Sequence, residues 1–357
     1  MGISTKSAVA TLVLLAAVCA VPLPAAEGRT PIWQPTAINA PGKYILTRDV
    51  VVAAGSVIVI NTDHVDIDLN GFRVETGAPV PVISGIGKNN LTIRNGTVAG
   101  GGAGISLSSG QNFVIEDVKV VGAGLGGIEL FDMTAFAIRR VHVSNCGTIG
   151  IAIGPPAGFE TSGVIEDSEI ANCQEGIIVE GASSTILRGN RVEQTTGSFG
   201  IHVFGSFGVL MVENTVQDAA AQGMWIEASF GCKLQNNVVL RSGASGIELI
   251  GTMDSLLLDN VVSQSRFDGI VVAGEGNHIE RNIVSANGTA GNGWGLHIVG
   301  GFIQPNVYRG NSGFGNPGPG AACPGVPATT DFCDDTPGIN VSPLAGIGGD
   351  NVIPIPL

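Results

Sequence analysis

The chain has 357 residues, 54 of them glycine, and a formal net charge of −13 at pH 7. Charged residues make up 13% and hydrophobic residues 44%, so the apolar content is too high for a disordered chain. The acidic balance, without a basic stripe, argues against nucleic acid as a partner, since phosphate binding needs clustered Lys and Arg, and disfavours long-range capture of polyanionic sugars.

Residues 1–26 have the pattern of an export signal. Lys6 precedes a short apolar run from Ala8 to Val21, and small residues follow up to Ala26, near which we expect cleavage. The run is shorter than the roughly 20 residues that span a bilayer. We therefore predict a secreted protein, extracellular or periplasmic, with no membrane span.

A regular repeat follows residues 27–80, which we expect to form an N-terminal cap and a first coil. Within 81–314, a Gly followed by an apolar-x-apolar strand recurs roughly every 23 to 26 residues, a period typical of repeat architectures. The repeats begin at Gly104, Gly127, Gly150, Gly176, Gly200, Gly223, Gly246, Gly269 and Gly295.

Each repeat also contains a second strand that leads into a turn with Asn at a fixed position. Stacked coils would place these amides in a ladder at the strand spacing of about 4.8 Å. A buried amide is costly unless it is paired, so the ladder is expected to hold the coils in register and to have no catalytic role. Its members are Asn190, Asn214, Asn237, Asn260 and Asn282, with a continuation at Asn311.

Three short strands per coil predict three parallel sheets, and so an all-β parallel β-helix with about nine clear coils. A leucine-rich-repeat horseshoe has a similar period, but it needs helical segments that the β-branched residues and Gly do not supply. Open solenoid ends expose unpaired strands and need covering. The Pro- and Gly-rich segment 315–357 is therefore predicted to be the C-terminal cap of a single domain.

Three segments resemble a known family: Pro41–Thr47, Val65–Phe72 and Leu91–Val98. They look like the opening of the bacterial right-handed parallel β-helix repeat proteins, and the resemblance covers nearly the whole mature chain. It implies the right-handed fold of the pectate lyases and their relatives. Most of this subgroup has no assigned activity, so the resemblance implies no reaction. We predict no cofactor; calcium, which pectate-type lyases usually bind, has no support in this sequence.

Five of the six cysteines follow the expected cleavage point. Cys146 and Cys173 hold equivalent positions in consecutive coils, and we predict a disulfide because neighbouring coils bring equivalent Cα atoms within roughly 4.4–6.8 Å. A second disulfide is predicted between Cys323 and Cys333. Cys232 falls on an inward position and is expected to be a buried free thiol. No metal site is predicted, because no Cys-x-x-Cys or nearby His pair is present.

Strand alternation sends the second and fourth residues after each repeat Gly outward. Aromatic faces suit sugar rings and carboxylates accept hydrogen bonds from sugar hydroxyls. Substrate binding is therefore predicted for Trp225, Phe204 and Glu180, although these aromatics would equally suit packing under a loop or a partner. The outward residues of the middle coils are Ile178, Glu180, His202, Phe204, Trp225, Glu227, Glu248 and Ile250.

The same strands hold two candidate catalytic carboxylates. Glu227 and Glu248 lie on neighbouring coils, offset by two residues, which puts their Cα atoms about 8 Å apart. This is compatible with the roughly 6.5–9.5 Å between the carboxyl groups of inverting glycosidases, and His202 is an alternative base. The competing interpretation is that both are solvated on an exposed strand, which is the commoner case for Glu.

Three functions are compatible with these features. The leading hypothesis is a secreted β-helix that contacts a polysaccharide or cell-surface glycan, or another surface, through the sheet of first strands. The second is a polysaccharide-degrading enzyme acting at the patch around Trp225, with a glycoside hydrolase preferred and a lyase as the weaker alternative. The third is a rigid cell-surface spacer.

Overall fold

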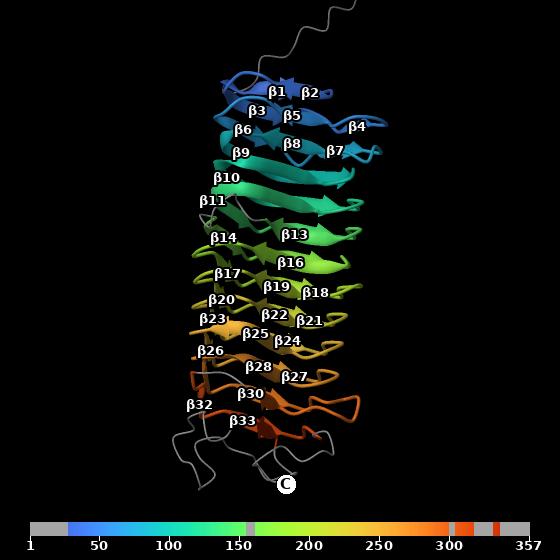
Figure 1. The fold of residues 1–357 in the computed structure, drawn as a ribbon. Coiled ribbons are helices and arrows are strands. Elements are labelled where there is room, and N and C mark those ends of the chain that lie inside the picture. Colours follow the sequence, from blue (N-terminus) through green and yellow to red (C-terminus); the bar gives the residue numbers. More distant parts are fainter. Residues whose placement is uncertain (1–27, 155–160, 300–303, 318–330, 336–357) are drawn as a thin grey trace, which may run out of the picture.

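A computed structural model describes residues 28–154, 161–299, 304–317 and 331–335. These residues form 34 strands, and successive coils pair in parallel, so that they stack along one axis (Figure 1). None of the described segments is a helix long and apolar enough to cross a membrane. The predicted export signal and Cys323 lie outside the described residues.

Three sheets run along the solenoid, because each coil gives one strand to each of them. Sheet 1 is built from β2 (Thr36–Ile38), β5 (Ile58–Ile60), β8 (Ile83–Ile86), the first parts of β10 (Ile105–Val121) and β11 (Ile128–Arg139), β13 (Ile149–Ile153), β16 (Glu175–Glu180), β19 (Ile201–Phe204), β22 (Met224–Glu227), β25 (Ile247–Met253), β28 (Ile270–Glu275), β31 (Leu296–Ile298) and β34 (Phe332–Asp334).

Sheets 2 and 3 complete each coil. Sheet 2 is built from β1 (Thr30–Ile32), β3 (Gly42–Leu46), β6 (Val65–Asp68), the first part of β9 (Asn89–Gly100), the middle of β10, the end of β11, β14 (Gly163–Glu166), β17 (Ile186–Arg188), β20 (Leu210–Val212), β23 (Lys233–Gln235), β26 (Leu256–Leu258), β29 (His278–Glu280) and β32 (Val307–Arg309). Sheet 3 is built from β4 (Val50–Val52), β7 (Arg73–Thr76), the ends of β9 and β10, β12 (His142–Ser144), β15 (Glu169–Ala171), β18 (Arg191–Glu193), β21 (Thr215–Gln217), β24 (Val238–Leu240), β27 (Val261–Ser263), β30 (Ile283–Ser285) and β33 (Ser312–Phe314).

This arrangement confirms the predicted three-sheet parallel β-helix. It has about 11 turns instead of nine, because regular stacking already begins at β1, which pairs with β3. Much of the segment 27–80 thus belongs to regular turns of the solenoid and is not a separate cap. At the other end, β34 pairs with β31, so the segment 315–357 contributes a further strand of sheet 1.

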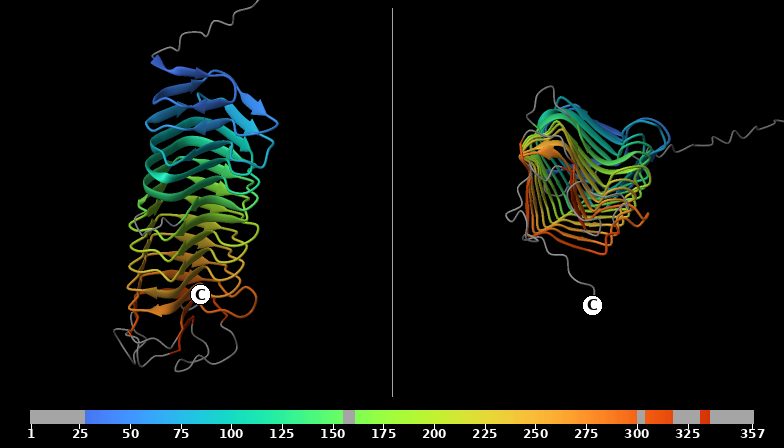
Figure 2. Two further views of the ribbon diagram at one scale, coloured as in Figure 1. Left: turned by 45° about the horizontal axis from the view of Figure 1, so that its top comes forward. Right: turned by 60° about the horizontal axis from the view of Figure 1, so that its bottom comes forward.

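The core is a column of apolar side chains that point inward from all three sheets. In one coil, Ile201 and Val203 of β19, Met211 of β20 and Val216 of β21 are fully buried. Burying such a side chain contributes roughly 1.5–3 kcal/mol. Because every coil repeats this pattern, the coils superimpose closely when the solenoid is seen towards its end (Figure 2).

The predicted Asn ladder is confirmed at the turn between sheets 2 and 3. The side-chain amide of Asn214 donates to Asn237 Oδ1 at 3.0 Å, and that of Asn237 to Asn260 Oδ1 at 2.9 Å; the ladder continues to Asn311. Each amide also donates to a carbonyl of the preceding coil, as Asn237 does to Met211 O at 2.9 Å. The ladder therefore satisfies backbone groups as well as its own.

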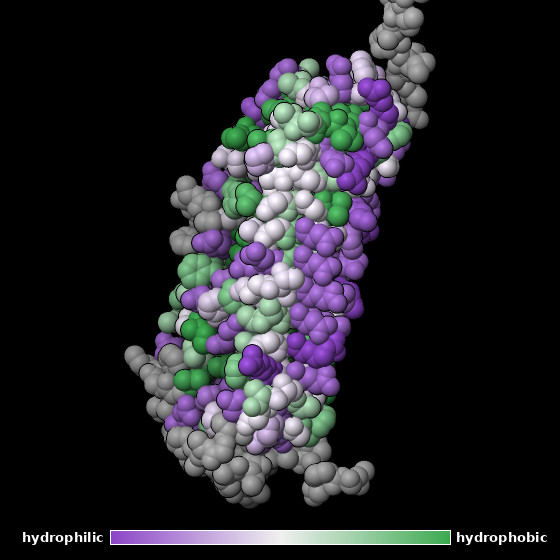
Figure 3. All heavy atoms as spheres, turned by 90° about the vertical axis from the view of Figure 1, so that its right-hand side faces the viewer, coloured by the Kyte–Doolittle hydropathy of each residue, from purple (hydrophilic) through white to green (hydrophobic). Residues whose placement is uncertain are grey.

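The turns themselves use left-handed backbone conformations. The residue before each ladder Asn has a positive φ, for example Asn236 (55°), Asp259 (57°) and Arg281 (52°). Asn and Asp enter this region more readily than most residues, which explains their frequency at the turns. Since equivalent positions stack, side chains of one kind form stripes along the solenoid, such as the hydrophilic stripe in Figure 3.

The described cysteines correct one expectation. Cys232 is a buried free thiol, as predicted, but Cys146 and Cys173 are also buried free thiols and not the expected disulfide. They do lie next to each other: the Cys146 N–H donates to Cys173 Sγ at 3.3 Å. Ala219 occupies the equivalent position two coils further on and is equally buried, so the coil needs only a small side chain there.

Candidate functional site

The outer face of sheet 1 carries the residues that the alternation predicted to point outward. Ile201 and Val203 are fully buried, whereas Phe204 beside them is 37% exposed. Side chains of successive coils stack in two columns. The first column is Ile178, His202, Trp225, Glu248, Val271 and His297, and the second is Glu180, Phe204, Glu227, Ile250 and Ala273.

Four aromatic rings gather on β19, β22 and the turn before β19, and we call them the aromatic patch: Phe199, His202, Phe204 and Trp225. The rings of His202 and Trp225 are stacked, 4.5 Å apart at 10°. Phe199 packs on both, with centroids 4.6 Å from Trp225 and 5.0 Å from His202. Phe199 was missed in the sequence because it precedes the repeat Gly and so lies outside the strand pattern.

The predicted carboxylates flank this patch. Glu180 pairs in register with Phe204. Glu227 Oε2 lies 3.5 Å from His202 Nε2, and Glu248 Oε2 accepts a 2.7 Å hydrogen bond from Gln222 Nε2. Trp225 pairs with Glu248 and Glu227 with Ile250, which confirms the predicted offset of one coil and two residues between the carboxylates.

The protonation of His202 follows from its surroundings. Burial lowers the pKa of its imidazole, and the opposing effect of the nearby Glu227 is smaller. The ring is therefore neutral at pH 7, with one nitrogen able to donate and the other to accept a hydrogen bond. The patch thus combines apolar ring faces with carboxylate acceptors and a neutral imidazole.

A second cluster lies further along the same face, around His297 of β31. His297 Nδ1 is 3.2 Å from Asp268 Oδ2, and Nε2 is 3.3 Å from Asp335 Oδ2. The Trp294 ring packs beside the imidazole at 4.4 Å and 56°. Sequence reasoning missed this cluster because it assigned Asp335 to the C-terminal cap, although alternation sends His297, the second residue after Gly295, outward.

The two carboxylates set the charge of His297. Burial alone would lower the pKa of its imidazole, but the hydrogen bond and charge of Asp268, together with those of Asp335, outweigh burial and raise it. Since the folded-state pKa lies above the unfolded one, the resulting stabilisation is fully present below the unfolded pKa and is lost as the pH rises through the folded pKa.

We therefore expect His297→Gln to lower the free energy of unfolding by about 1.5–3 kcal/mol at about pH 5.5, the size of a hydrogen bond to a charged group. The loss should shrink as the pH rises to about 9. Thermal unfolding of the wild type and the variant across this range measures the difference. A loss that stays constant with pH would contradict the ionised cluster.

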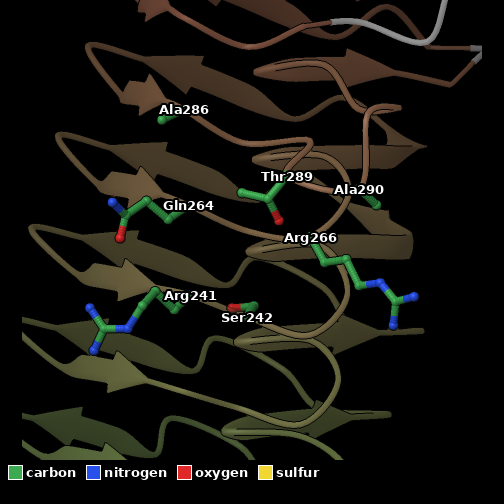
Figure 4. A pocket seen from close by; sticks show the side chains of 7 residues that line it. All are labelled: Arg241, Ser242, Gln264, Arg266, Ala286, Thr289 and Ala290. Atoms are coloured by element: carbon green, nitrogen blue, oxygen red, sulfur yellow. The ribbon is translucent and has the colours of Figure 1, made fainter.

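One hollow on the described surface lies elsewhere. It has a volume of about 840 Å³ and lies between the end of sheet 3 and the turn that carries Thr289 and Ala290 (Figure 4). The Arg241 guanidinium donates two hydrogen bonds to the Asp218 carboxylate, at 2.6 and 3.0 Å. The guanidinium of Arg266 lies over the Phe267 ring. The same turn leads on to Trp294, which packs beside His297 on sheet 1. The hollow is lined by Arg241, Ser242, Gln264, Arg266, Ala286, Thr289 and Ala290.

Comparisons with known proteins agree with the fold. The family model described as "Right handed beta helix region" matches residues 50–158 and 81–255. The catalytic domain of a GH87 alpha-1,3-glucanase, solved with tetrasaccharides, is 10% identical with a TM-score of 0.50, over 91% of this chain and 61% of its own. No curated protein sequence matches.

Two further solved structures are similar. The N-terminal fragment of gene product 12 of bacteriophage phi29 is 14% identical with a TM-score of 0.47, over 77% of this chain and 61% of its own. A periplasmic alginate epimerase is 13% identical with a TM-score of 0.45, over 84% of this chain and 76% of its own. The chain spans about three fifths of the phage fragment and of the glucanase domain. At these identities the likeness concerns the fold alone.

Proposed function

Since this chain belongs to the right-handed β-helix family, with more than half of its residues matched, we propose that it acts through the outer face of its coils and binds a neutral glycan on sheet 1. The observation that carries the proposal is the aromatic patch with its flanking carboxylates. Fold alone would not assign a function, so the argument rests on these side chains.

The chemistry of the patch suits sugar rings. Partly exposed aromatic faces, such as that of Phe204, pack against the apolar C–H faces of a pyranose. Glu180, Glu227 and Glu248 supply acceptors for hydroxyl groups, and the neutral His202 can donate or accept. A few placed polar groups among apolar surface is the usual composition of a small-molecule or sugar site.

The charge of the face favours a neutral ligand over a uronate polymer. In the described coils from β8 to β31, no outward position of sheet 1 holds Lys or Arg. A polyanion would meet Glu180, Glu227 and Glu248 without a counter-charge, which is unfavourable. The protein as a whole is also acidic, with a net charge of −13.

A spacer function has less support. A rigid spacer needs no exposed aromatic side chains, and clusters of such side chains usually mark a contact surface. Hydrolysis by Glu227 and Glu248 has their offset in its favour but no further observation. We place the protein outside the cytoplasm, in the periplasm or the extracellular space, because of its predicted export signal and the location of most polysaccharide ligands.

We expect Trp225→Ala to weaken glycan binding at least tenfold, since losing an aromatic anchor costs roughly 1.4–2 kcal/mol. Affinity electrophoresis of the mature protein in gels with neutral polysaccharides, and in parallel with polygalacturonate, measures retention. Phe204→Ser, at a more exposed position, should weaken binding without a fold defect. Trp33→Ala is the matched control, because Trp33 is 41% exposed in the first coil.

Equal retention of Trp225→Ala, Phe204→Ser and the wild type would remove the patch as the binding surface. Preferential retention by polygalacturonate would contradict the neutral ligand. Release of reducing ends from a retained polysaccharide, abolished by Glu248→Gln, would instead support the hydrolase hypothesis.

A further inference from the structure

One arrangement of side chains occurs twice on sheet 1. Phe199-Gly-Ile-His202 and Trp294-Gly-Leu-His297 share the order aromatic, Gly, aliphatic, His. In both, the aromatic ring packs against the imidazole: Phe199 and His202 at 5.0 Å and 47°, Trp294 and His297 at 4.4 Å and 56°. The repeat glycines of the two motifs, Gly200 and Gly295, lie four coils apart.

The coil that follows each motif contributes a carboxylate at the same place. Glu227 pairs with Phe204, two residues beyond His202, and its Oε2 lies 3.5 Å from His202 Nε2. Asp335 holds the corresponding position beyond His297, since the preceding Asp334 pairs with Ile298. Its Oδ2 lies 3.3 Å from His297 Nε2.

The coil that precedes each motif also contributes a carboxylate. Glu175 and Asp268 each come directly before a repeat Gly. The N–H of Gly176 donates to Phe199 O at 3.0 Å, and that of Gly269 to Trp294 O at 2.8 Å, so the two acids occupy equivalent positions. Their contacts differ: Asp268 accepts a hydrogen bond from the Trp294 N–H at 2.7 Å and bonds to His297 Nδ1 at 3.2 Å, and the described contacts of Glu175 include neither of these.

The coil repeat does not impose this arrangement. The coils between the motifs fold with the same strand register, yet they hold Gln222 and Trp225, or Ser245 and Glu248, at the aromatic and His positions. Burial repeats as well: the imidazoles are 15% and 17% exposed, and both following carboxylates are 32% exposed. The fold therefore tolerates other residues here, and the recurrence points to a shared ligand.

We propose that Asp268, Trp294, His297 and Asp335 form a second sugar-binding site, which repeats the part of the aromatic patch made by Phe199, His202 and the flanking Glu227, and that one neutral glycan chain lies along sheet 1 and occupies both. This inference rests on the proposed function, because it extends the same face to a second point of attachment. It also fixes the direction of the glycan, parallel to the axis of the solenoid.

The distance between the sites sets the length of glycan required. Four coils correspond to about 19 Å at the strand spacing. On β28, the strand between Glu248 and the second site, the outward residues are the small Val271 and Ala273. No large side chain of that strand therefore blocks a glycan chain that runs from the aromatic patch to the second site. A chain long enough to reach both sites binds the second in an intramolecular step, which raises the overall affinity.

Calorimetry with neutral gluco-oligosaccharides of the cello, laminari and malto series tests this directly. Of the series that binds, the shortest members should bind two per protein and the long members one per protein, at least tenfold more tightly. Trp294→Ala should reduce the short members to one per protein and abolish the gain with length. Asp335→Asn, which keeps the shape of the side chain, should weaken the second site alone, and Trp33→Ala should change neither readout.

One short oligosaccharide per wild-type protein, with no change in Trp294→Ala or Asp335→Asn, would overturn the second site and leave the proposed function intact. Failure of the wild type to bind any neutral oligosaccharide or polysaccharide would overturn both. Two short ligands per protein that persist in Trp294→Ala but fall to one in Phe199→Ala would place the second ligand elsewhere and also overturn this inference.

Discussion

Replacing Asn237 with leucine is expected to lower the free energy of unfolding by about 3–6 kcal/mol. The Asn237 side chain is fully buried and accepts hydrogen bonds from the backbone N–H and the side-chain amide of Asn214, both at 3.0 Å. It donates to Met211 O and to Asn260 Oδ1, both at 2.9 Å. Leucine leaves these groups buried without partners, and each orphaned group costs roughly 1–3 kcal/mol.

Urea unfolding followed by circular dichroism measures this loss. Asn236→Gly is the matched control, because Asn236 is the adjacent residue but is exposed, and glycine fits its φ of 55°. We expect that variant to stay within about 1 kcal/mol of the wild type. A loss in Asn237→Leu no larger than in Asn236→Gly would show that the ladder does not hold the coils together.

Replacing Gly223 with alanine is expected to cost about 3 kcal/mol. A Cβ at this position would lie 2.3 Å from Val239 Cγ1 and 2.7 Å from the backbone oxygen of Gly246. The oxygen belongs to the next coil and cannot move away without disturbing the stacking, and overpacking of this kind costs roughly 1–3 kcal/mol or more. The repeat Gly thus marks a close approach between coils.

The same unfolding assay compares Gly223→Ala with Gly77→Ala. At Gly77 the nearest atom to an added Cβ, the backbone oxygen of Ala53, is 3.8 Å away, and the backbone needs no left-handed conformation. That control should be neutral or slightly stabilising, because alanine restricts the unfolded chain. Equal effects of the two substitutions would argue that the Gly at the start of each sheet 1 strand is not sterically required.

The fold was predictable from the sequence because the coil repeats one physical pattern. Each Gly that permits close approach, each inward pair such as Ile201 and Val203, and each ladder Asn recurs with the same spacing. The first coils were not recognised in the sequence, since they lack the repeat Gly. The later Asn columns, Asn277 with Asn306 and Asn287 with Asn316, were not recognised because they run across irregular spacings.

The candidate site was predictable only in part. Alternation placed His202, Trp225 and Glu227 on one face, since it depends on the backbone alone. The stacking of His202 on Trp225 and the position of Phe199 depend on rotamers and on turn geometry, which alternation does not specify. The second site also required β34 to return to sheet 1 after a long segment, although the shared aromatic-Gly-aliphatic-His order is visible in the sequence.

Hydroxyl-radical footprinting with the best-retained neutral polysaccharide tests the central claim most directly, because it shows which side chains the glycan covers. We predict that oxidation of Phe199, Phe204 and Trp225 falls when the polysaccharide is added, while oxidation of Trp33 in the first coil is unchanged. Protection of Trp33 or of Phe267 beside the Arg266 hollow, with none at Phe204 and Trp225, would contradict a glycan-binding face on sheet 1.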